Sequence, residues 1–274
     1  MKKKGKNMFN LHKSIFRDQY LEIFSKDSIE IKKKENRNAS KSWMNKQGSF
    51  PEKMYVVFER LLKRKSEKQD SLVFFDVGAA EGCYSCSVVE NFNSGTVVSF
   101  EPELPRLEVF IENLSAYIDR FNRRGDDFNI QIYEKLVTSG DEETLSLRHF
   151  VCPKTGGGAG SSSIVKFDRP NRLYVDVEYE TVKLDDFIND YEKVDIIKID
   201  VEGAEIDVLK GAKRFFDKFK PICFLEIHGA VQNGSITIEN VKEIVNTYNT
   251  EYEFVCIEVH SAPRLSYYLM KPKA

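Results

Sequence analysis

The sequence lacks the features that mark membrane-spanning, disulfide-stabilised or strongly nucleic-acid-binding proteins. No apolar run approaches the roughly 18 residues needed to cross a bilayer. Five cysteines are an odd number in a chain of 274 residues, which argues against a disulfide scaffold. The formal net charge is −2, so no overall basic field attracts nucleic acid. We therefore expect neither a transmembrane segment nor a nucleic-acid partner.

Two motifs are present only in part. The glycine-rich run at 156–160 is not followed by Gly-Lys-Ser/Thr, which excludes a phosphate loop of the Walker type. Cys83 and Cys86 have CxxC spacing but no second pair, so we expect them to pack within a helix rather than bind zinc. The basic start Met1–Lys6 is followed by polar residues such as Asn10 and not by an apolar run. These observations favour a cytoplasmic protein.

What is present is an ordinary globular composition, with 41% hydrophobic and 31% charged residues. The length fits one large α/β domain with an appendage. We assign residues 1–50 to a basic N-terminal helix and linker, with the helix between Phe9 and Phe24, and residues 51–274 to the main domain.

From residue 54 onward, short apolar runs alternate with helical patterns. The strands expected from these runs are 72–77, 96–101, 129–137, 194–200 and 221–228. This alternation predicts a doubly wound, mainly parallel α/β sheet. Residues 254–270 predict an antiparallel edge hairpin. Residues 144–182 predict a small antiparallel insertion whose glycine-rich loop is either a mobile surface loop or a substrate-gating lid.

Polar side chains stand at the ends of four of the expected strands. They are Asp76, Glu101, Asp200 and the pair Glu226 and His228. Because the carboxyl ends of parallel strands share one edge of a sheet, these groups are expected to meet over one crevice. The sequence therefore predicts a functional site at that edge.

The turn after the first strand indicates the ligand. A dinucleotide fingerprint needs three spaced glycines, and here Ala80 and Cys83 replace the second and third. Glu81 places a negative charge that opposes a pyrophosphate but suits the amino group and sulfonium of S-adenosylmethionine. Glu101 follows Gly78 at about the 20-residue interval typical of a carboxylate that binds ribose hydroxyls. An NAD(P)-linked oxidoreductase and a non-catalytic cofactor-binding protein remain as alternatives.

The motifs together resemble the FkbM family of S-adenosylmethionine-dependent methyltransferases over residues 54–271. The resemblance rests on Asp-Val-Gly-Ala-Ala-Glu-Gly at 76–82, Phe-Glu-Pro at 100–102, Lys-Ile-Asp-Val-Glu-Gly-Ala-Glu at 198–205 and Leu-Glu-Ile-His at 225–228. It implies the Rossmann-like class I methyltransferase fold with a seven-stranded sheet. It also implies O-methylation of a small-molecule or glycan hydroxyl.

The resemblance also implies roles for particular residues. The group expected to bind S-adenosylmethionine is Asp76, Gly78, Ala80, Glu81 and Glu101. The group expected to be catalytic is Asp200, Glu226 and His228. Asp141 or Glu142 is expected near the adenine.

Two mechanisms stay open for activating the acceptor hydroxyl. In one, His228 or Asp200 is the general base. In the other, Asp200, Glu202 and Glu226 hold Mg²⁺, which lowers the pKa of the bound hydroxyl. Glu205 is interpreted as a first-turn acid that stabilises its helix through the dipole.

Overall fold

The structure of the protein is a computed structural model. The structure describes residues 10–13, 30, 33–34, 36–38, 41, 53–123, 127–151, 173–229, 236–260 and 265–273. The glycine-rich loop and most of the predicted N-terminal helix lie outside these residues. Within the described part, no helix is both long and apolar enough to cross a membrane.

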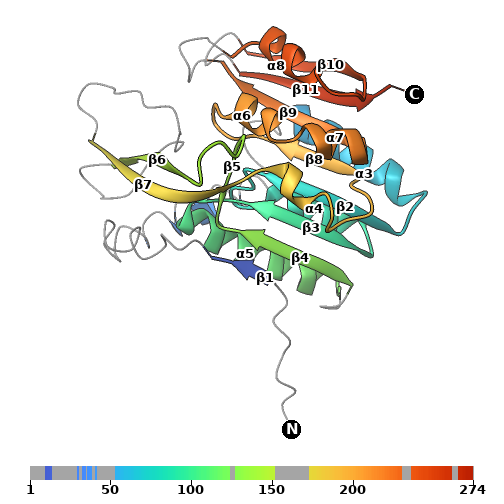
Figure 1. Ribbon diagram of the computed structural model, residues 1–274. Coiled ribbons are helices and arrows are strands. Elements are labelled where there is room, and N and C mark those ends of the chain that lie inside the picture. Colours follow the sequence, from blue (N-terminus) through green and yellow to red (C-terminus); the bar gives the residue numbers. More distant parts are fainter. Residues whose placement is uncertain are drawn as a thin grey trace.

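A mixed eight-stranded sheet forms the centre of the described structure (Figure 1). In spatial order its strands are β1 (Asn10–His12), β4 (Phe128–Tyr133), β3 (Ser94–Phe100), β2 (Ser71–Val77), β8 (Ile196–Ile199), β9 (Ile222–His228), β11 (Leu265–Pro272) and β10 (Tyr252–Val259). The five pairings from β1 to β9 are parallel. The two pairings that join β11 to β9 and to β10 are antiparallel, which confirms the predicted edge hairpin.

The expected count of seven strands is wrong because the N-terminal segment adds β1. Asn10–His12 pairs in parallel with Gln131–Tyr133 of β4, where a helix had been predicted. The ring of His12 stacks on Tyr133 at 4.1 Å between centroids, which fixes the added strand on its neighbour. The assignment of residues 1–50 to a separate appendage stays a prediction.

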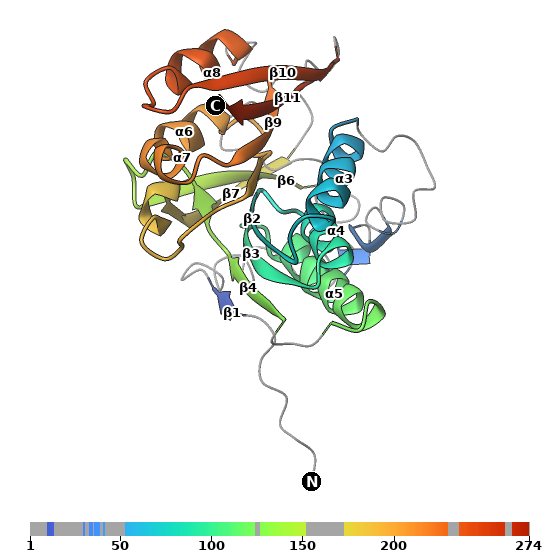
Figure 2. The same ribbon diagram turned by 90° about the vertical axis from the view of Figure 1, so that its right-hand side faces the viewer.

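Helices cover both faces of the sheet, as Figure 2 shows. One layer holds α3 (Lys53–Ser66), α4 (Cys83–Asn91) and α5 (Leu104–Arg120), and the other holds α6 (Glu205–Lys210), α7 (Lys213–Phe219) and α8 (Ile238–Val245). Gly211 separates α6 from α7. A β-carbon at Gly211 would lie 2.2 Å from the backbone oxygen of Thr138, so the chain passes too close there for a side chain.

Strand β2 is buried on both faces, as its sequence predicts. Phe74 packs on the α3 layer, where its ring lies 5.4 Å from that of Phe58. Phe75 points to the opposite layer, 5.0 Å from the ring of Phe215. Alternate side chains therefore enter separate cores, and β2 is held rigidly where it meets the glycine turn.

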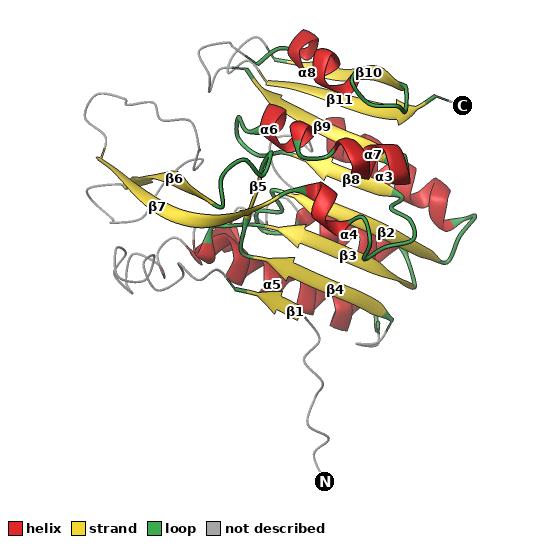
Figure 3. Ribbon diagram, in the orientation of Figure 1, coloured by secondary structure: helices red, strands yellow, loops and turns green. Residues whose placement is uncertain are grey.

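A three-stranded sheet stands beyond the carboxyl ends of the parallel strands (Figure 3). It consists of β5 (Leu136–Val137), β7 (Leu173–Val182) and β6 (Thr144–Val151), followed by the 3₁₀ turn Leu184–Phe187. The antiparallel β6–β7 pair confirms the predicted insertion. Leu136–Val137, expected as the end of β4, instead pairs with β7. The insertion thus stands beside the edge where the site was predicted.

Candidate active site

A cavity of about 670 Å³, partly open to solvent, lies where the small sheet meets the main one. Its lining comes from the ends of β2, β3, β4 and β8 and from the small sheet. The lining residues are Val77, Gly78, Ala80, Phe100, Glu101, Pro102, Glu103, Arg106, Lys135, Leu136, Val137, Leu147, Asp200, Val201, Glu202 and Ala204. It lies at the carboxyl edge of the sheet, and of the strand-end groups expected there Glu101 and Asp200 line it, whereas Asp76, Glu226 and His228 do not.

The turn after β2 lies directly against the residues that follow β8. Gly78 has φ +77°, and a β-carbon there would lie 1.8 Å from the backbone oxygen of Asp200. Ala80 also has a positive φ, at 49°, and so does Glu202 on the facing turn, at 53°. Both non-glycine residues line the cavity. Such backbone is costly and persists where surrounding structure enforces it, which is typical of functional sites.

A buried lysine supports this turn from below. The register of β2 and β8 sets Asp76 beside Lys198, and the two side chains are 1% and 2% exposed. Lys198 Nζ donates to the carbonyl of Gly78 at 2.5 Å and lies 3.2 Å from Oδ2 of Asp200. Burial opposes its charge, but Asp200 and Asp76 outweigh burial and raise the pKa of Lys198. One cation thereby ties the glycine turn to Asp200.

Glu101 is held at the cavity wall by the backbone. Its Oε2 accepts from the N–H of Ala80 at 2.9 Å, and its Oε1 accepts from that of Glu103 at 2.8 Å. Burial is the main cause that raises the pKa of Glu101 to about 7. Because a carboxylate has about four acceptor positions, each oxygen keeps room for one more donor. Glu101 is therefore shaped to receive a pair of hydroxyls.

The expected cofactor residues divide into two groups. Gly78, Ala80 and Glu101 line the cavity, whereas Asp76 and Glu81 do not. Asp76 accepts a hydrogen bond from Ser85 Oγ at 2.7 Å and supports the turn from within the core. Asp141 and Glu142, expected near the adenine, are not among the residues that line the cavity, and their role stays a prediction.

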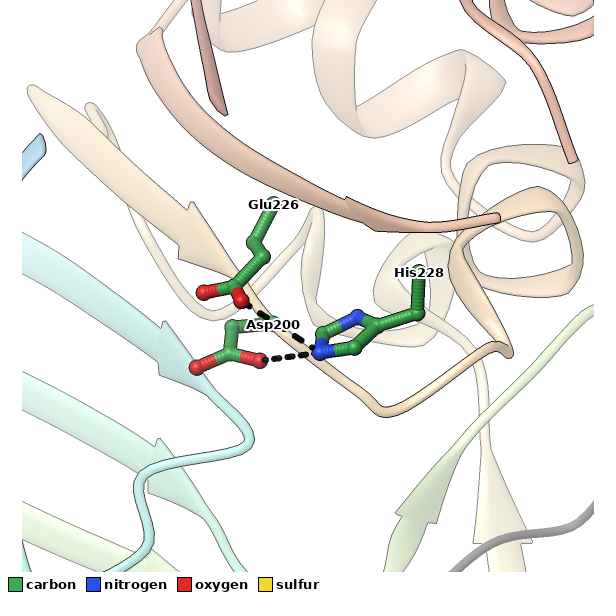
Figure 4. A group of neighbouring side chains, drawn as sticks. All are labelled: Asp200, Glu226 and His228. Carbon is green, nitrogen blue, oxygen red and sulfur yellow. Dashed lines mark ion pairs between the residues drawn. The ribbon is translucent and has the colours of Figure 1, made fainter. Parts of the chain in front are cut away.

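The expected catalytic residues do converge, as Figure 4 shows. Asp200, Glu226 and His228 each offer a ligand atom within 4.8 Å of the others. Nε2 of His228 lies 3.3 Å from Glu226 Oε1 and 3.8 Å from Asp200 Oδ1. Glu202 Oε2 approaches the same nitrogen at 3.5 Å. Three carboxylates therefore surround one imidazole nitrogen.

The other nitrogen of His228 contacts a residue that sequence reasoning assigned to helix stabilisation. Glu205 is 0% exposed, and its Oε1 lies 2.8 Å from Nδ1 of His228. The same oxygen accepts from the N–H of Gly203 at 3.0 Å. The sequence shows Glu205 in the first turn of a helix and His228 at the end of a strand. Their spacing in the sequence does not reveal that Glu205 is buried against His228.

The surrounding carboxylates set the charge of His228. Burial opposes protonation, but the hydrogen bond with Glu205 and the charge of Asp200 outweigh it and raise the pKa of His228 to about 10. Burial likewise opposes the Asp200 carboxylate, but Lys198 and His228 keep the pKa of Asp200 below its ordinary value. At neutral pH the site therefore pairs an imidazolium with ionised Asp200.

Comparison with known families identifies the chain. The sequence profile described as "Methyltransferase FkbM domain" matches residues 76–255. The chain belongs to the FkbM methyltransferase family. The match includes the glycine turn, Glu101 and the whole carboxylate cluster around His228. The resemblance predicted from the motifs is thereby confirmed, and the nicotinamide alternative loses its basis.

Two of the solved structures that are similar to this chain are named as methyltransferases. Methyltransferase FkbM from Methylobacillus flagellatus KT is 18% identical with a TM-score of 0.47, and the match covers 77% of this chain and 47% of that one. This chain thus spans about half the length of that protein. The O-methyltransferase from Bacillus cereus in complex with SAH is 14% identical with a TM-score of 0.47, covering 94% and 96%. No curated protein matches the chain.

The cavity of this FkbM domain fits S-adenosylmethionine. The strained turn at Gly78 brings backbone to the cavity wall, where a side chain at that position would collide with Asp200. Glu101 has acceptor positions for the ribose diol. Leu136, Val137 and Leu147 supply an apolar wall for a flat base.

The carboxylate cluster does not fit Mg²⁺ in this arrangement. Asp200, Glu202 and Glu226 converge on Nε2 of His228, so a cation held by these carboxylates would also meet a nitrogen ligand. Such a mixed set suits Mg²⁺ less well than oxygen ligands alone. The base mechanism is therefore the one developed below.

Proposed function

We propose that this FkbM chain transfers the methyl group of S-adenosylmethionine to a hydroxyl of a sugar or related small molecule. The observation that carries the proposal is one cavity lined both by Gly78, Ala80 and Glu101 and by Asp200 and Glu202. Groups assigned to the cofactor and carboxylates assigned to the acceptor therefore line one cavity. S-adenosylmethionine supplies an activated methyl group when bound, and the chain's task is to align the acceptor oxygen and remove its proton.

Asp200 is the residue proposed to receive that proton. Its side chain is 27% exposed and lines the cavity, whereas His228 lies behind it and carries a proton at neutral pH. A carboxylate with a lowered pKa is a weak base. It suffices here because the acceptor oxygen becomes strongly acidic as its bond to the methyl carbon forms.

His228 is proposed to position the reacting carboxylate. Its imidazolium offsets the repulsion among Asp200, Glu202 and Glu226, which would otherwise destabilise three neighbouring negative charges. Glu226 contacts the same nitrogen from β9 and completes the cluster. This arrangement supports a fixed orientation of Asp200 towards the acceptor.

The test is methyl transfer from S-adenosylmethionine labelled with ¹³C in the methyl group. The chain is incubated with panels of neutral sugars, glycosides, amines and thiols, and products are identified by carbon NMR, which distinguishes O-methyl from N-methyl and S-methyl groups. An O-methyl product that Asp200→Asn fails to form supports the proposal. Transfer only to nitrogen or sulfur contradicts it. Binding of S-adenosylmethionine without methyl transfer to any acceptor favours the non-catalytic alternative.

The cytoplasmic location of the protein stays a prediction.

A further inference from the structure

Arg106 lies in the cavity without a role in the mechanism above. It belongs to the first turn of α5 and lines the same space as Gly78, Ala80 and Glu101. Its side chain is 26% exposed. A guanidinium at the wall of a cofactor cavity therefore calls for a chemical explanation.

Within the described part of the chain, the guanidinium of Arg106 makes no hydrogen bond. Its Nε lies 3.8 Å from Oε2 of Glu103, and its Nη1 lies 3.9 Å from Oε1 of Glu81. Both distances exceed the range of a hydrogen bond. The five N–H donors of the group are therefore available to a ligand in the cavity.

Other arginines of this chain behave differently beside acids. Arg148 donates to both oxygens of Asp176 at 2.8 and 3.0 Å, and Arg37 donates to both oxygens of Glu112 at 2.8 Å. Such two-point pairs are what a guanidinium forms when its task is to neutralise a carboxylate. Arg106 has carboxylates on two sides and forms no such pair. Its ion pairs with Glu81 and Glu103 offset its charge but leave its N–H donors free for a further acceptor.

We propose that Arg106 binds the α-carboxylate of S-adenosylmethionine through a two-point hydrogen bond. The inference rests on the proposed cofactor. Arg106 lines the same cavity as Gly78 and Glu101, which are assigned to the cofactor. The amino-acid end of the cofactor is assigned to the glycine turn, and Glu81 of that turn lies 3.9 Å from Nη1 of Arg106. That end carries the carboxylate that a guanidinium in this position can bind at two points.

The test compares two ligands on three forms of the full chain. Calorimetry measures the Kd of S-adenosylmethionine and of its decarboxylated analogue for the wild type, Arg106→Met and Arg106→Lys. Arg106→Met is expected to raise the Kd of S-adenosylmethionine about 10- to 100-fold and the Kd of the decarboxylated analogue less than about twofold. Arg106→Lys is expected to give an intermediate loss of affinity, because lysine keeps the positive charge but not the paired N–H donors of the guanidinium. Arg120→Met is the matched control, since it removes the guanidinium at the far end of the same helix.

The ratio between the two ligands decides the outcome, because partial unfolding of a variant would weaken both equally. An equal loss for both ligands, or no loss for either, overturns the assignment of Arg106 and leaves the proposed function standing. If the wild type binds neither S-adenosylmethionine nor S-adenosylhomocysteine, the proposed function falls as well. A melting curve for each variant shows whether the fold is kept.

Discussion

Oε1 of Glu205 lies 2.8 Å from Nδ1 of His228, and both side chains are buried. The carboxylate is fixed in turn by the N–H of Gly203. A buried acid on one nitrogen favours the imidazolium and fixes the plane of the ring. Glu205 is therefore a positioning residue that acts on Asp200 through His228.

Glu205→Gln is expected to lower the pKa of His228 from about 10 towards the ordinary histidine value of about 6.5. The substitution keeps the shape and removes the charge. We expect turnover to fall about tenfold, while binding of S-adenosylmethionine is kept. NMR titration of the His228 ring gives the pKa directly. Asp207→Asn is the control, since it removes an exposed first-turn acid of the same helix, and an equal effect of both variants would mean that only the helix dipole matters.

His228→Gln is expected to destabilise the chain most at low pH. The folded-state pKa of His228 is raised, so its stabilising contribution is complete below the unfolded value of about 6.5 and is lost as pH rises through about 10. The difference in unfolding free energy between wild type and variant should shrink by at most ~1.4 kcal/mol per pH unit in that window. Urea denaturation at several pH values measures it. A difference between wild type and His228→Gln that widens as pH rises would contradict the assignment.

Asp200→Asn is expected to lower kcat by about 10²- to 10⁴-fold, in the range of general-base contributions. Because the pKa of Asp200 is lowered, kcat of the wild type should stay level between about pH 7 and 9. A rate that climbs until about pH 10 would instead make neutral His228 the base. The pH profile of kcat at saturating cofactor separates the two.

Glu101→Gln is expected to weaken the binding of S-adenosylmethionine about 10- to 100-fold, because hydrogen bonds to a charged group are lost. Since the pKa of Glu101 is about 7, the wild type should bind about tenfold more tightly at pH 8 than at pH 6. The variant should show no such dependence. Calorimetry at both pH values checks this, and equal pH dependence in the two proteins would remove Glu101 from the cofactor site.

Gly78→Ala is expected to abolish cofactor binding as well as reduce stability. The new methyl group would collide with the backbone of Asp200 and force the turn apart. Gly140→Ala is the matched control, because its φ is +81° but its nearest neighbour, Cδ of Lys183 at 3.0 Å, can move. Gly140→Ala should lower the free energy of unfolding by about 1–2 kcal/mol, because of backbone strain alone. Thermal melting with and without S-adenosylmethionine distinguishes the variants.

The arrangement of strands and the edge of the site were predictable from the sequence. The apolar runs that end in Asp76, Glu101, Asp200 and His228 form neighbouring strands, because parallel connections bring their carboxyl ends together. The additional strand Asn10–His12 was not predictable. Three residues carry too little periodicity to distinguish a strand from a helix, and their pairing with β4 depends on tertiary contact.

Within the site, the types of residue were predictable from the sequence, but the directions in which their side chains point were not. Asp76 and Glu101 both end buried strands, yet Asp76 points into the core towards Lys198 while Glu101 reaches the cavity. Asp76 lies within β2, opposite Ser99, whereas Glu101 follows the last residue of β3, so it is the point at which each strand ends that decides. The burial of Glu205 and the unbonded guanidinium of Arg106 depend on packing between distant elements, which a single sequence does not encode locally.

The most direct test of the central claim is calorimetry of the purified chain with S-adenosylmethionine, S-adenosylhomocysteine and NAD⁺. The account predicts that the first two bind and that NAD⁺ does not, because Glu81 and the missing glycines oppose a pyrophosphate. Binding of NAD⁺ alone, or of none of the three, would contradict the cofactor assignment on which the proposed reaction depends.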